Sequence, residues 1–369
     1  MTADPMQILF VGETWKGSSA RSLREAHEQL PGVAIDEVCE DHYSPKGSSL
    51  VVRSAVRLLR PWHRAELQRA IGAKIAADRP QVLLVYKGSG VSADVVRRAK
   101  QMGVLTVNVF PDCSPHAYGP RLQRAMGEYD LVISTKPFHP EGWKSIYSYH
   151  NRCLFVPHGY DPAVHYRATA PDSAQQKFDL TMVANWRPQY HGLMLELASR
   201  IAGKGLRVAI AGAGWSSHAQ DLPRDWQLAD AVRGRAYGEF ARQGRIAIAP
   251  VHREVVINGR RQPGDEDSTR TYELAALQCF FVHRRTPFAR TVYDEQREVP
   301  MWDDVAELAG LIDRYLPEPV ARAEMAARAH ARAVPAYSIP SRAEQVLKLI
   351  EAEMSAAGVA RERRASAVR

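Results

Sequence analysis

Residues 81–110 read QVLLVYKGSGVSADVVRRAKQMGVLTVNVF, and this stretch decides the fold. Two short apolar runs, residues 81–86 and 104–109, flank an amphipathic segment at residues 92–102. Continuous β-branched runs are typical of strands buried on both faces of a parallel sheet, and Ser92 is a good N-cap for a helix between them. The stretch therefore predicts a strand–helix–strand unit of a doubly wound α/β domain.

The same alternation continues in both directions along the chain. Further strands are predicted at residues 7–12, 33–38, 131–134 and 153–156, and a second series at residues 180–183, 206–211, 245–250 and 279–283. Between the two series, residues 156–172 hold three prolines and one glycine and lack apolar periodicity, which indicates a linker. We therefore expect an α/β protein with two Rossmann-like, doubly wound domains that face each other across a cleft.

These boundaries predict five parts of the chain. They are an N-terminal, acceptor-side domain at 1–160, a linker at 161–176, a C-terminal, donor-side domain at 177–340, a helix at 341–357 and a basic tail at 358–369. We expect the helix at 341–357 to pack back on the N-terminal domain.

The composition limits the function. The 369 residues carry a net charge of +8 and are 45% hydrophobic, which suits two folded domains that handle phosphate esters or bind nucleic acid. The basic residues are dispersed without an aromatic–basic stripe, so we expect no nucleic-acid binding. With no bilayer-length apolar run and no secretory signal pattern, we expect a cytoplasmic protein. The basic tail predicts at most a weak peripheral association with the inner face of the membrane.

The four cysteines are scattered along the chain without a C-x-x-C spacing. That pattern argues against a zinc site and against a disulfide framework.

A glycine-rich turn follows the first predicted strand. It contains Gly12, Gly17 and Ser18, at the start of a predicted helix, where backbone N–H groups can approach a phosphate or a sugar hydroxyl. Ser18 stands where a P-loop needs lysine, so this is not a P-loop. We count these three residues as candidate donor contacts; the alternative is a tight turn that needs glycine for its geometry.

Titratable side chains follow the strand at 104–109. Asp112 and His116 lie at its carboxyl end, where a sheet of this type binds ligands. Either residue can serve as the general base or contact the donor sugar, and we take both as candidate catalytic residues. The alternative is an Asx turn at Asp112 and a solvated imidazole at His116.

Three turns of the second half follow strands at the same predicted edge. Asn185 and Arg187 come after the first of these strands, Gly212 and Gly214 after the next, and the turn at residues 250–252, which ends in His252, after a third. An arginine beside a helix N-terminus can hold a diphosphate with charge-assisted hydrogen bonds. We take the first four of these residues as candidate donor contacts, against the alternative that Arg187 is an ordinary surface residue.

Residues 267–282 carry the strongest motif, DSTRTYELAALQCFFV. Ser268 or Thr269 caps a helix, Arg270 lies in its first turn, and Glu273 follows one turn later. A helix N-terminus with an arginine favours phosphate, and a carboxylate can accept hydrogen bonds from both hydroxyls of a ribose. We count Arg270, Thr271 and Glu273 as donor contacts. The alternative is an exposed Arg–Glu pair at i and i+3.

Taken in order, these motifs resemble the family-four type of glycosyltransferase, and in particular the CgeB-like (spore-maturation-protein-like) group, which has the two-Rossmann GT-B fold. The resemblance covers most of residues 178–350 and is looser over residues 1–160. It rests on the segments 185–187 (NWR), 210–215 (IAGAGW), 237–240 (YGEF), 268–273 (STRTYE) and 293–304 (YDEQREVPMWDD).

The resemblance implies roles for individual residues. Glu273 resembles the ribose-binding glutamate, and Arg187 and Arg270 resemble contacts to the donor phosphates. The wider superfamily often carries E-x7-E ending at this glutamate, and here Asp265 occupies the first position. Such enzymes usually need no metal, and no D-x-D follows a predicted strand, so we expect neither a metal nor a cofactor.

The leading hypothesis is a glycosyltransferase, of hexosyl or related type, that uses a UDP-, GDP- or dTDP-linked sugar as its donor. Its acceptor is a glycan, a lipid-linked molecule or a protein. Two other functions stay open: a sugar-nucleotide epimerase of the same architecture, and a non-catalytic scaffold that binds sugar nucleotides. The sequence leaves the donor base, the sugar, the acceptor, the stereochemical course and the oligomeric state unspecified.

Overall fold

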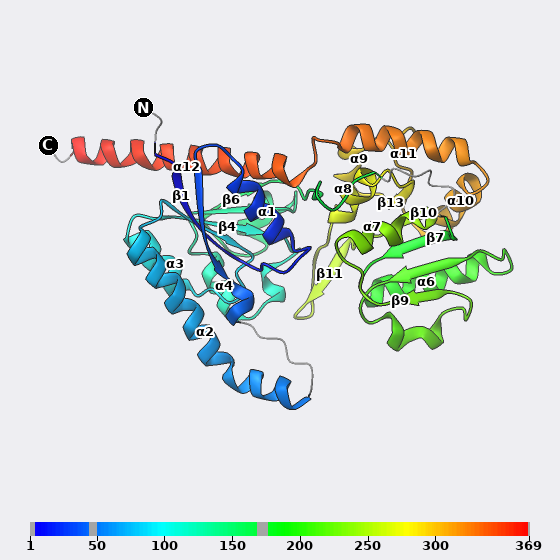
Figure 1. The fold of residues 1–369 in the computed structure, drawn as a ribbon, viewed down its shortest axis with the longest axis horizontal. Coiled ribbons are helices and arrows are strands. Elements are labelled where there is room, and N and C mark those ends of the chain that lie inside the picture. Colours follow the sequence, from blue (N-terminus) through cyan, green and yellow to red (C-terminus); the bar gives the residue numbers. More distant parts are fainter. Residues whose placement is uncertain (1–3, 44–49, 168–175, 368–369) are drawn as a thin grey trace. The chain divides into compact units, whose positions relative to one another are not determined.

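The computed structural model describes residues 4–43, 50–167 and 176–367 (Figure 1). Its chain divides into two compact units. The first comprises Met1–Pro157, Val256–Pro263 and Ile339–Arg369, and the second His158–Val255 and Gly264–Ser338.

The first unit is built on a six-stranded, fully parallel sheet in the order β2-β1-β3-β4-β5-β6. Its strands are β1 (Met6–Gly12), β2 (Val33–Cys39), β3 (Val82–Tyr86), β4 (Leu105–Phe110), β5 (Leu131–Ser134) and β6 (Arg152–Phe155). Successive side chains of β3 enter different cores: Leu84 packs on one face of the sheet and Leu83 on the other. This burial on both faces explains why the strands are apolar without a break.

Helices cover both faces of that sheet. One face packs against α1 (Ser19–Glu28) and α12 (Ile339–Ala367), which lie side by side in Figure 1. The other face packs against α2 (Leu50–Asp78), α3 (Ala93–Gln101), α4 (Pro120–Met126) and α5 (His139–Ser145). The last helix of the chain thus belongs to the first unit.

The second unit repeats this architecture with the strand order β14-β13-β10-β7-β8-β9, again all parallel. Its strands are β7 (Phe178–Val183), β8 (Val208–Ala211), β9 (Gln227–Ala229), β10 (Gly244–Ala249), β13 (Phe281–Arg284) and β14 (Met301–Trp302). The prediction of two doubly wound α/β domains is confirmed.

Helices cover both faces of the second sheet as well. One core joins it to α6 (Pro188–Ile201) and α10 (Val305–Tyr315), and the other to α7 (Arg235–Arg242), α8 (Thr269–Ala276) and α9 (Ala289–Val292). Helix α11 (Pro319–Ala333) contributes to both cores, with Met325 in the first and Ala329 in the second.

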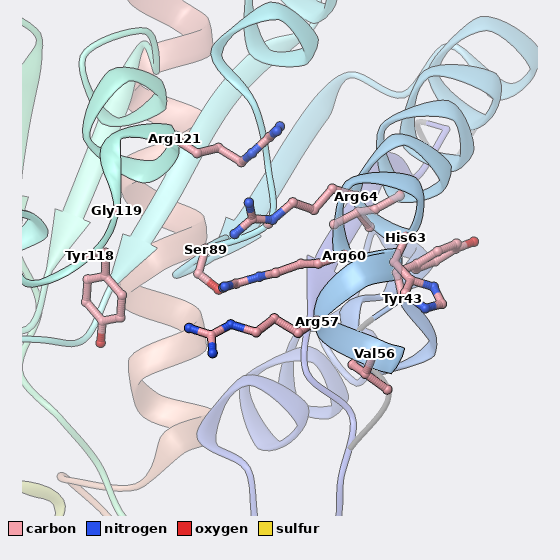
Figure 2. Close-up of a pocket in the computed structure, with 12 residues that line it drawn as sticks. Tyr43, Val56, Arg57, Arg60, His63, Arg64, Ser89, Tyr118, Gly119 and Arg121 are labelled. Carbon is pink, nitrogen blue, oxygen red and sulfur yellow. The ribbon is translucent and has the colours of Figure 1, made fainter. Parts of the chain in front are cut away.

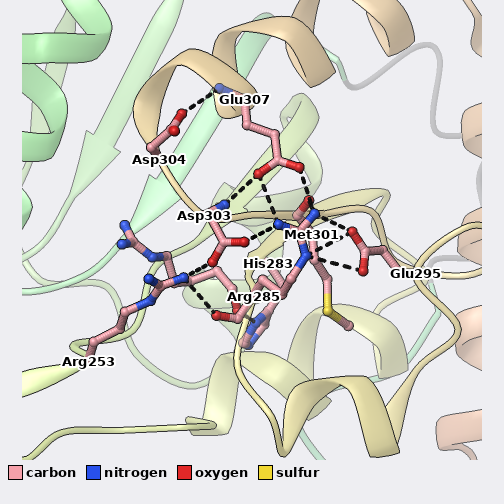
Figure 3. Close-up of polar contacts among 9 residues, drawn as sticks. Arg253, His283, Arg285, Glu295, Met301, Asp303, Asp304 and Glu307 are labelled. Carbon is pink, nitrogen blue, oxygen red and sulfur yellow. Dashed lines mark hydrogen bonds and ion pairs between the residues drawn. The ribbon is translucent and has the colours of Figure 1, made fainter.

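An ion-pair network fixes the edge of this sheet (Figure 3). Arg285, directly after β13, donates to Glu307 Oε1 at 2.6 Å and to Glu295 Oε1 at 3.0 Å, and it pairs with Asp303. Its Nη2 also donates to the carbonyl of Met301 at 2.9 Å. The acidic segment after residue 293 therefore ties β13, β14 and the start of α10 together.

The structure adds elements that the sequence pattern did not predict. Two short strands, β11 (Glu254–Ile257) and β12 (Arg260–Pro263), form a separate two-stranded sheet. Helix α12 continues past residue 357 to Ala367, so most of the segment at 358–369 is helical. Of the linker at 161–176, residues 168–175 lie outside the described part of the chain, and the rest belongs to the second unit. No described helix is long and apolar enough to cross a membrane.

Candidate functional site

The strand order of the second sheet reverses between β7 and β10, because the chain runs outward to β8 and β9 on one side and to β13 and β14 on the other. In open α/β sheets, ligands bind outside the carboxyl ends of the strands at such a point. The loops that leave β7 and β10 there are residues 184–187 and 250–252. The candidate site of the second unit is therefore built on these two loops.

The β7 loop is held closely against the β8 loop. Asn185 Oδ1 accepts from the Ala213 amide at 3.0 Å, and the Trp186 amide donates to the Ala213 carbonyl at 2.8 Å. A Cβ atom on Gly212 would lie 2.0 Å from the Ala184 carbonyl oxygen. Asn185 and Gly212 thus act on loop geometry, and the loop they hold presents Arg187.

Gly214 serves the same junction. It adopts a left-handed conformation, with φ of +91°, where the short helix η4 (Trp215–Asp221) begins. The buried Trp215 that follows donates from Nε1 to the Ala184 carbonyl at 2.6 Å. Both predicted glycines therefore have backbone reasons to be glycine.

Arg187 is exposed at the N-cap position of α6, and it has no acidic partner among the residues that the structure describes. Arg270, in the first turn of α8, donates from Nη2 to the Pro250 carbonyl at 3.3 Å. It reaches the end of β10 from a helix that starts elsewhere in the sequence. The two predicted phosphate contacts therefore both border the loops at the point where the strand order reverses.

His252 reports the charge around these arginines. Its ring stacks on Tyr190 at 4.0 Å, and its buried Nδ1 has no hydrogen-bond partner among the residues that the structure covers. Burial lowers the pKa of His252 to about 4; Asp265 opposes that shift, and Arg270 and Arg187 add to it. The imidazole is therefore neutral at pH 7, chiefly because it is buried.

Thr271 is fully buried within the cap of α8. Its Oγ1 accepts from the Ser268 amide at 3.0 Å and lies 2.8 Å from Nε2 of the buried His283. The Thr271 hydroxyl, which was predicted to contact the sugar donor, is thus bonded to groups inside the protein. Thr271 fixes the start of the helix that carries Arg270 and Glu273.

Glu273 is largely shielded from solvent, with its side chain 15% exposed. Its Oε1 is 3.7 Å from Nε2 of His165, whose ring packs edge-on against Tyr237. Burial, and then the charge of Glu273, hold the pKa of Tyr237 well above its usual value, so the phenol stays protonated beside the carboxylate. Glu273 is a shielded carboxylate, unlike the exposed surface pair of the alternative interpretation.

In the first unit, the turn of Gly12, Gly17 and Ser18 is a strand–helix junction. Ser18 is buried and its Oγ accepts from the Ala20 amide at 3.2 Å, which caps α1. Gly17 is left-handed, with φ of +94°, and a Cβ on Gly12 would lie 2.9 Å from the Phe10 ring. Each of the three residues thus has a role in the geometry of this turn.

Asp112 follows β4 and is held by two donors. Lys87 Nζ lies 3.0 Å from its Oδ2, and the Tyr118 hydroxyl donates to the same oxygen. The Lys87 ammonium also lies 4.6 Å from the centre of the Tyr118 ring. Although burial opposes it, the charge of Asp112 raises the pKa of Lys87. Asp112 and Lys87 therefore form a fixed pair at the carboxyl ends of β3 and β4.

His116 lies on the short helix η2 (Pro115–Ala117), and its ring packs against those of Tyr147 and Tyr149, at 5.3 and 6.5 Å between centres. Burial, and then the positive charge of Arg260, lower the pKa of His116 from its usual value. Its imidazole is therefore neutral at pH 7 and able to accept a proton. Of the two predicted catalytic residues, His116 has the properties of a base and Asp112 those of a structural partner.

Three residues of these sites escaped the sequence interpretation: Lys87, His165 and Tyr237. His252 was placed in a turn after a predicted strand but was given no role. Lys87 directly follows a predicted strand, so its position was an available signal. His165 lies in the segment predicted as a linker, and no local sequence pattern indicates its contact with Glu273. Tyr237 was part of the family resemblance but was given no role.

One further cluster involves titratable groups of the second unit. Nε2 of His191 and Nδ1 of His218 lie 3.4 and 3.5 Å from Oδ2 of Asp221. The three side chains each offer one ligand atom, and these atoms lie within 4.8 Å of one another. His218 also stacks on Trp186, with 4.1 Å between the ring centres.

Comparisons with known proteins concern the sequence family and the fold. Residues 188–348 match the family model described as "Glycosyl transferase-like", a segment that contains Arg270 and Glu273. No curated protein sequence matches the chain. The architecture is that of GT-B glycosyltransferase structures.

Three solved structures illustrate the structural similarity. Sucrose-phosphate synthase from Thermosynechococcus elongatus superimposes with a TM-score of 0.69 at 11% identity, over 95% of this chain and 100% of that one. HepE from Anabaena in complex with UDP gives 0.63 at 11% identity, over 94% and 100%. A candidate UDP-N-acetylglucosamine 2-epimerase from Listeria monocytogenes gives 0.57 at 11% identity, over 95% and 97%. At such identities, these similarities concern the fold.

Proposed function

We propose that this protein is a glycosyltransferase that transfers a sugar from a nucleotide-sugar donor bound by the second unit. One observation carries the proposal. Arg187 and Arg270, which have no acidic partner in the described part of the chain, border the loops at the β7–β10 reversal. A shielded carboxylate, Glu273, lies one turn beyond Arg270 on the same helix. A nucleoside diphosphate offers two groups that match them, a diphosphate and a ribose diol.

The diphosphate fits the positive side of this site. Guanidinium groups bind phosphate oxygens with charge-assisted hydrogen bonds, and the N-termini of α6 and α8 add backbone N–H groups and a partial positive charge. Burial mainly lowers the pKa of His252, and the charges of Arg270 and Arg187 add smaller contributions in the same direction. In the reaction, these groups would stabilise the charge that develops on the leaving diphosphate.

The ribose fits Glu273. Its two carboxylate oxygens can accept from adjacent hydroxyls, and His165, whose ring packs against Tyr237, lies 3.7 Å from one of them. A carboxylate that is already ordered loses little conformational entropy when the ligand binds. HepE structures contain UDP or UDP-glucose, so we propose a UDP-linked sugar as the first donor to test.

The chemical step would be a displacement at the anomeric carbon. Neutral His116 is the better candidate for a base in the first unit, and metal independence is part of the proposal because the two arginines supply the positive charge. The finer assignment, to the CgeB-like group with a hexosyl donor and a glycan, lipid-linked or protein acceptor, rests on the order of the sequence motifs alone.

A second candidate is a sugar-nucleotide epimerase, and the similarity to the Listeria protein is the observation that favours it. The two enzymes differ in one measurable respect. An epimerase converts its nucleotide sugar without an acceptor and keeps the nucleotide attached, whereas a transferase releases the nucleoside diphosphate.

Nucleotide binding tests the proposal directly. We expect UDP, or another of GDP, dTDP and CDP, to bind in calorimetry, and Arg270→Ala and Glu273→Gln each to raise Kd about tenfold to hundredfold. The loss of affinity should be the same for the nucleoside diphosphate and for the full nucleotide sugar, since neither residue is proposed to contact the sugar. Glu239→Gln on α7, which alters an exposed carboxylate of the same unit, is the matched control. Unchanged affinity in folded Arg270 and Glu273 variants would refute the donor site.

A further inference from the structure

The first unit contains a cavity that the proposed donor site does not use (Figure 2). Its volume is about 630 Å³, which lies within the range of small-molecule sites. Helix α2 forms one wall, and the loop after β3 and the start of α4 form the others. The polar residues that line it include Arg57, Arg60, Arg64, Ser89, Tyr118 and Arg121.

Three of its arginines share one face of α2. Arg57, Arg60 and Arg64 stand at positions i, i+3 and i+7, a spacing that places side chains in one row along a helix. Figure 2 shows their guanidinium groups extended toward Ser89, with Arg121 reaching in from α4. Four guanidinium groups from two helices therefore line a single cavity.

No carboxylate of the described residues compensates these charges. None of the four arginines forms an ion pair with a carboxylate in the described part of the chain, whereas Arg69, on the other side of α2, pairs with Glu66. Burial, and then the charges of Arg60 and Arg121, lower the pKa of Arg64, which is the effect of like charges held close together. A cluster of like charges of this kind is stabilised when an anion binds between them.

The carboxyl group beneath the cavity does not supply that anion. Glu40 is 9% exposed, and its Oε1 accepts from the Gly90 amide at 3.2 Å. Burial raises the pKa of Glu40 to about 7, so much of its population is neutral at that pH. Glu40 supports the loop after β3 and leaves the positive charge of the arginines in excess.

We infer that this cavity binds the phosphate or diphosphate group of a small ligand. A guanidinium matches two phosphate oxygens at once, and four of them around one cavity match a diphosphate better than a neutral glycan. If the proposed glycosyl transfer is right, the ligand is the acceptor, which is then a phosphate-bearing molecule. Phosphate binding itself does not depend on that function.

The phosphate has two sources, a soluble ester or a lipid headgroup. The same helix exposes Leu58 and Trp62, at 81% and 56%, on the side away from the arginine row. Apolar side chains beside a basic row are also found on helices that lie on membranes. The experiment must therefore separate the two sources.

The test uses the full chain with inorganic pyrophosphate as the soluble probe, and vesicles with and without 30% phosphatidylglycerol as the lipid probe. Titrations are run in the Arg270→Ala background, so that pyrophosphate binding at the donor site is weakened. We expect pyrophosphate or anionic vesicles to bind, and Arg60→Gln/Arg64→Gln to weaken binding at least tenfold. Arg69→Gln, which removes one positive charge on the opposite side of α2, should have little effect.

The outcomes separate clearly. Binding of pyrophosphate that the arginine variants lose supports a soluble phosphate ester, and arginine-dependent binding of anionic vesicles alone supports a lipid headgroup. Arg121→Gln, on α4, repeats the test if the double variant does not fold. Absence of binding to both probes, or equal losses in Arg69→Gln, would overturn the inference. UDP titrations on the arginine variants report separately on the donor site, so the two proposals can fail independently.

Discussion

Lys87 Nζ lies 3.0 Å from Asp112 Oδ2, and this pair joins the carboxyl ends of two neighbouring strands. The register of the sheet brings the two residues together, since Tyr86 of β3 pairs with Val109 of β4. The Tyr118 hydroxyl completes the group by donating to the same carboxylate oxygen. A carboxylate engaged by two donors is poorly placed to remove a proton from an acceptor, so we interpret Asp112 as a residue that positions Lys87.

We predict that Asp112 and Lys87 are energetically coupled. Asp112→Asn should lower the free energy of unfolding by roughly 1–2 kcal/mol, and by much less when Lys87 is already Met, because the ion pair is then absent. Urea denaturation of the two single variants and the double variant measures the coupling. Additive effects of the two substitutions would show that the pair contributes no interaction energy.

A second prediction concerns the pH dependence of turnover. Burial and Arg260 lower the pKa of His116, so its neutral form persists below pH 6.5 and is lost only as the pH falls through the lowered pKa. If His116 is the base, the rate of nucleoside diphosphate release should stay constant from pH 8 to about 6.5 and then fall in acid. His116→Ala should reduce it by roughly 100-fold or more.

The exposed His150 provides the control, since His150→Ala removes an imidazole without touching the proposed site. A His116→Ala variant with the wild-type rate and pH profile would exclude His116 as the base. A profile whose acid limb begins well above pH 6.5 would also argue against it.

Much of the fold could be predicted because the central strands are buried on both faces. Such strands are continuously apolar and stand out between polar helices, as residues 82–86 and 131–134 do. The elements that were missed lack this signal. Strand β14 has two residues, β9 has three, and β12 reads RRQP, which no hydrophobic pattern identifies.

The residues of the candidate site also differ in whether a local sequence signal reveals them. Arg187 and Arg270 were found because each lies next to a helix start, a position that the sequence reveals. His165 was missed because its contact with Glu273 joins residues 108 positions apart, through the tertiary fold. The arginine cavity was missed for a different reason: Arg57, Arg60 and Arg64 form a recognisable row, but the facing Arg121 comes from another helix.

A third prediction addresses metal dependence. Because Arg187 and Arg270 supply positive charge for the diphosphate, nucleotide binding and turnover should be unchanged after dialysis against EDTA. The cluster of His191, His218 and Asp221 is the place where a metal would have to be sought. We therefore expect His218→Ala to keep its nucleotide affinity. A loss on chelation that zinc or magnesium restores, and that His218→Ala reproduces, would contradict metal independence.

The last prediction concerns the backbone that presents Arg187. An alanine Cβ at Gly212 would lie 2.0 Å from the Ala184 carbonyl oxygen, a distance that no side-chain rotation can relieve. The two loops after β7 and β8 must separate to accept it. We expect Gly212→Ala to lower the stability of the second unit by roughly 3 kcal/mol, a shift in Tm of about 6–12 °C for a domain of this size. Because Arg187 moves with the loop, UDP affinity should also fall.

Gly192 on α6 is the matched control, because an added Cβ there meets nothing within 4 Å. In a helix interior, alanine is favoured over glycine by about 0.5–1 kcal/mol, so Gly192→Ala should raise Tm slightly and leave UDP affinity unchanged. Differential scanning calorimetry and UDP titration of both variants make the comparison. If Gly212→Ala melts within about 1 °C of the wild type and binds UDP equally well, the close contact between the loops does not hold Arg187 in place.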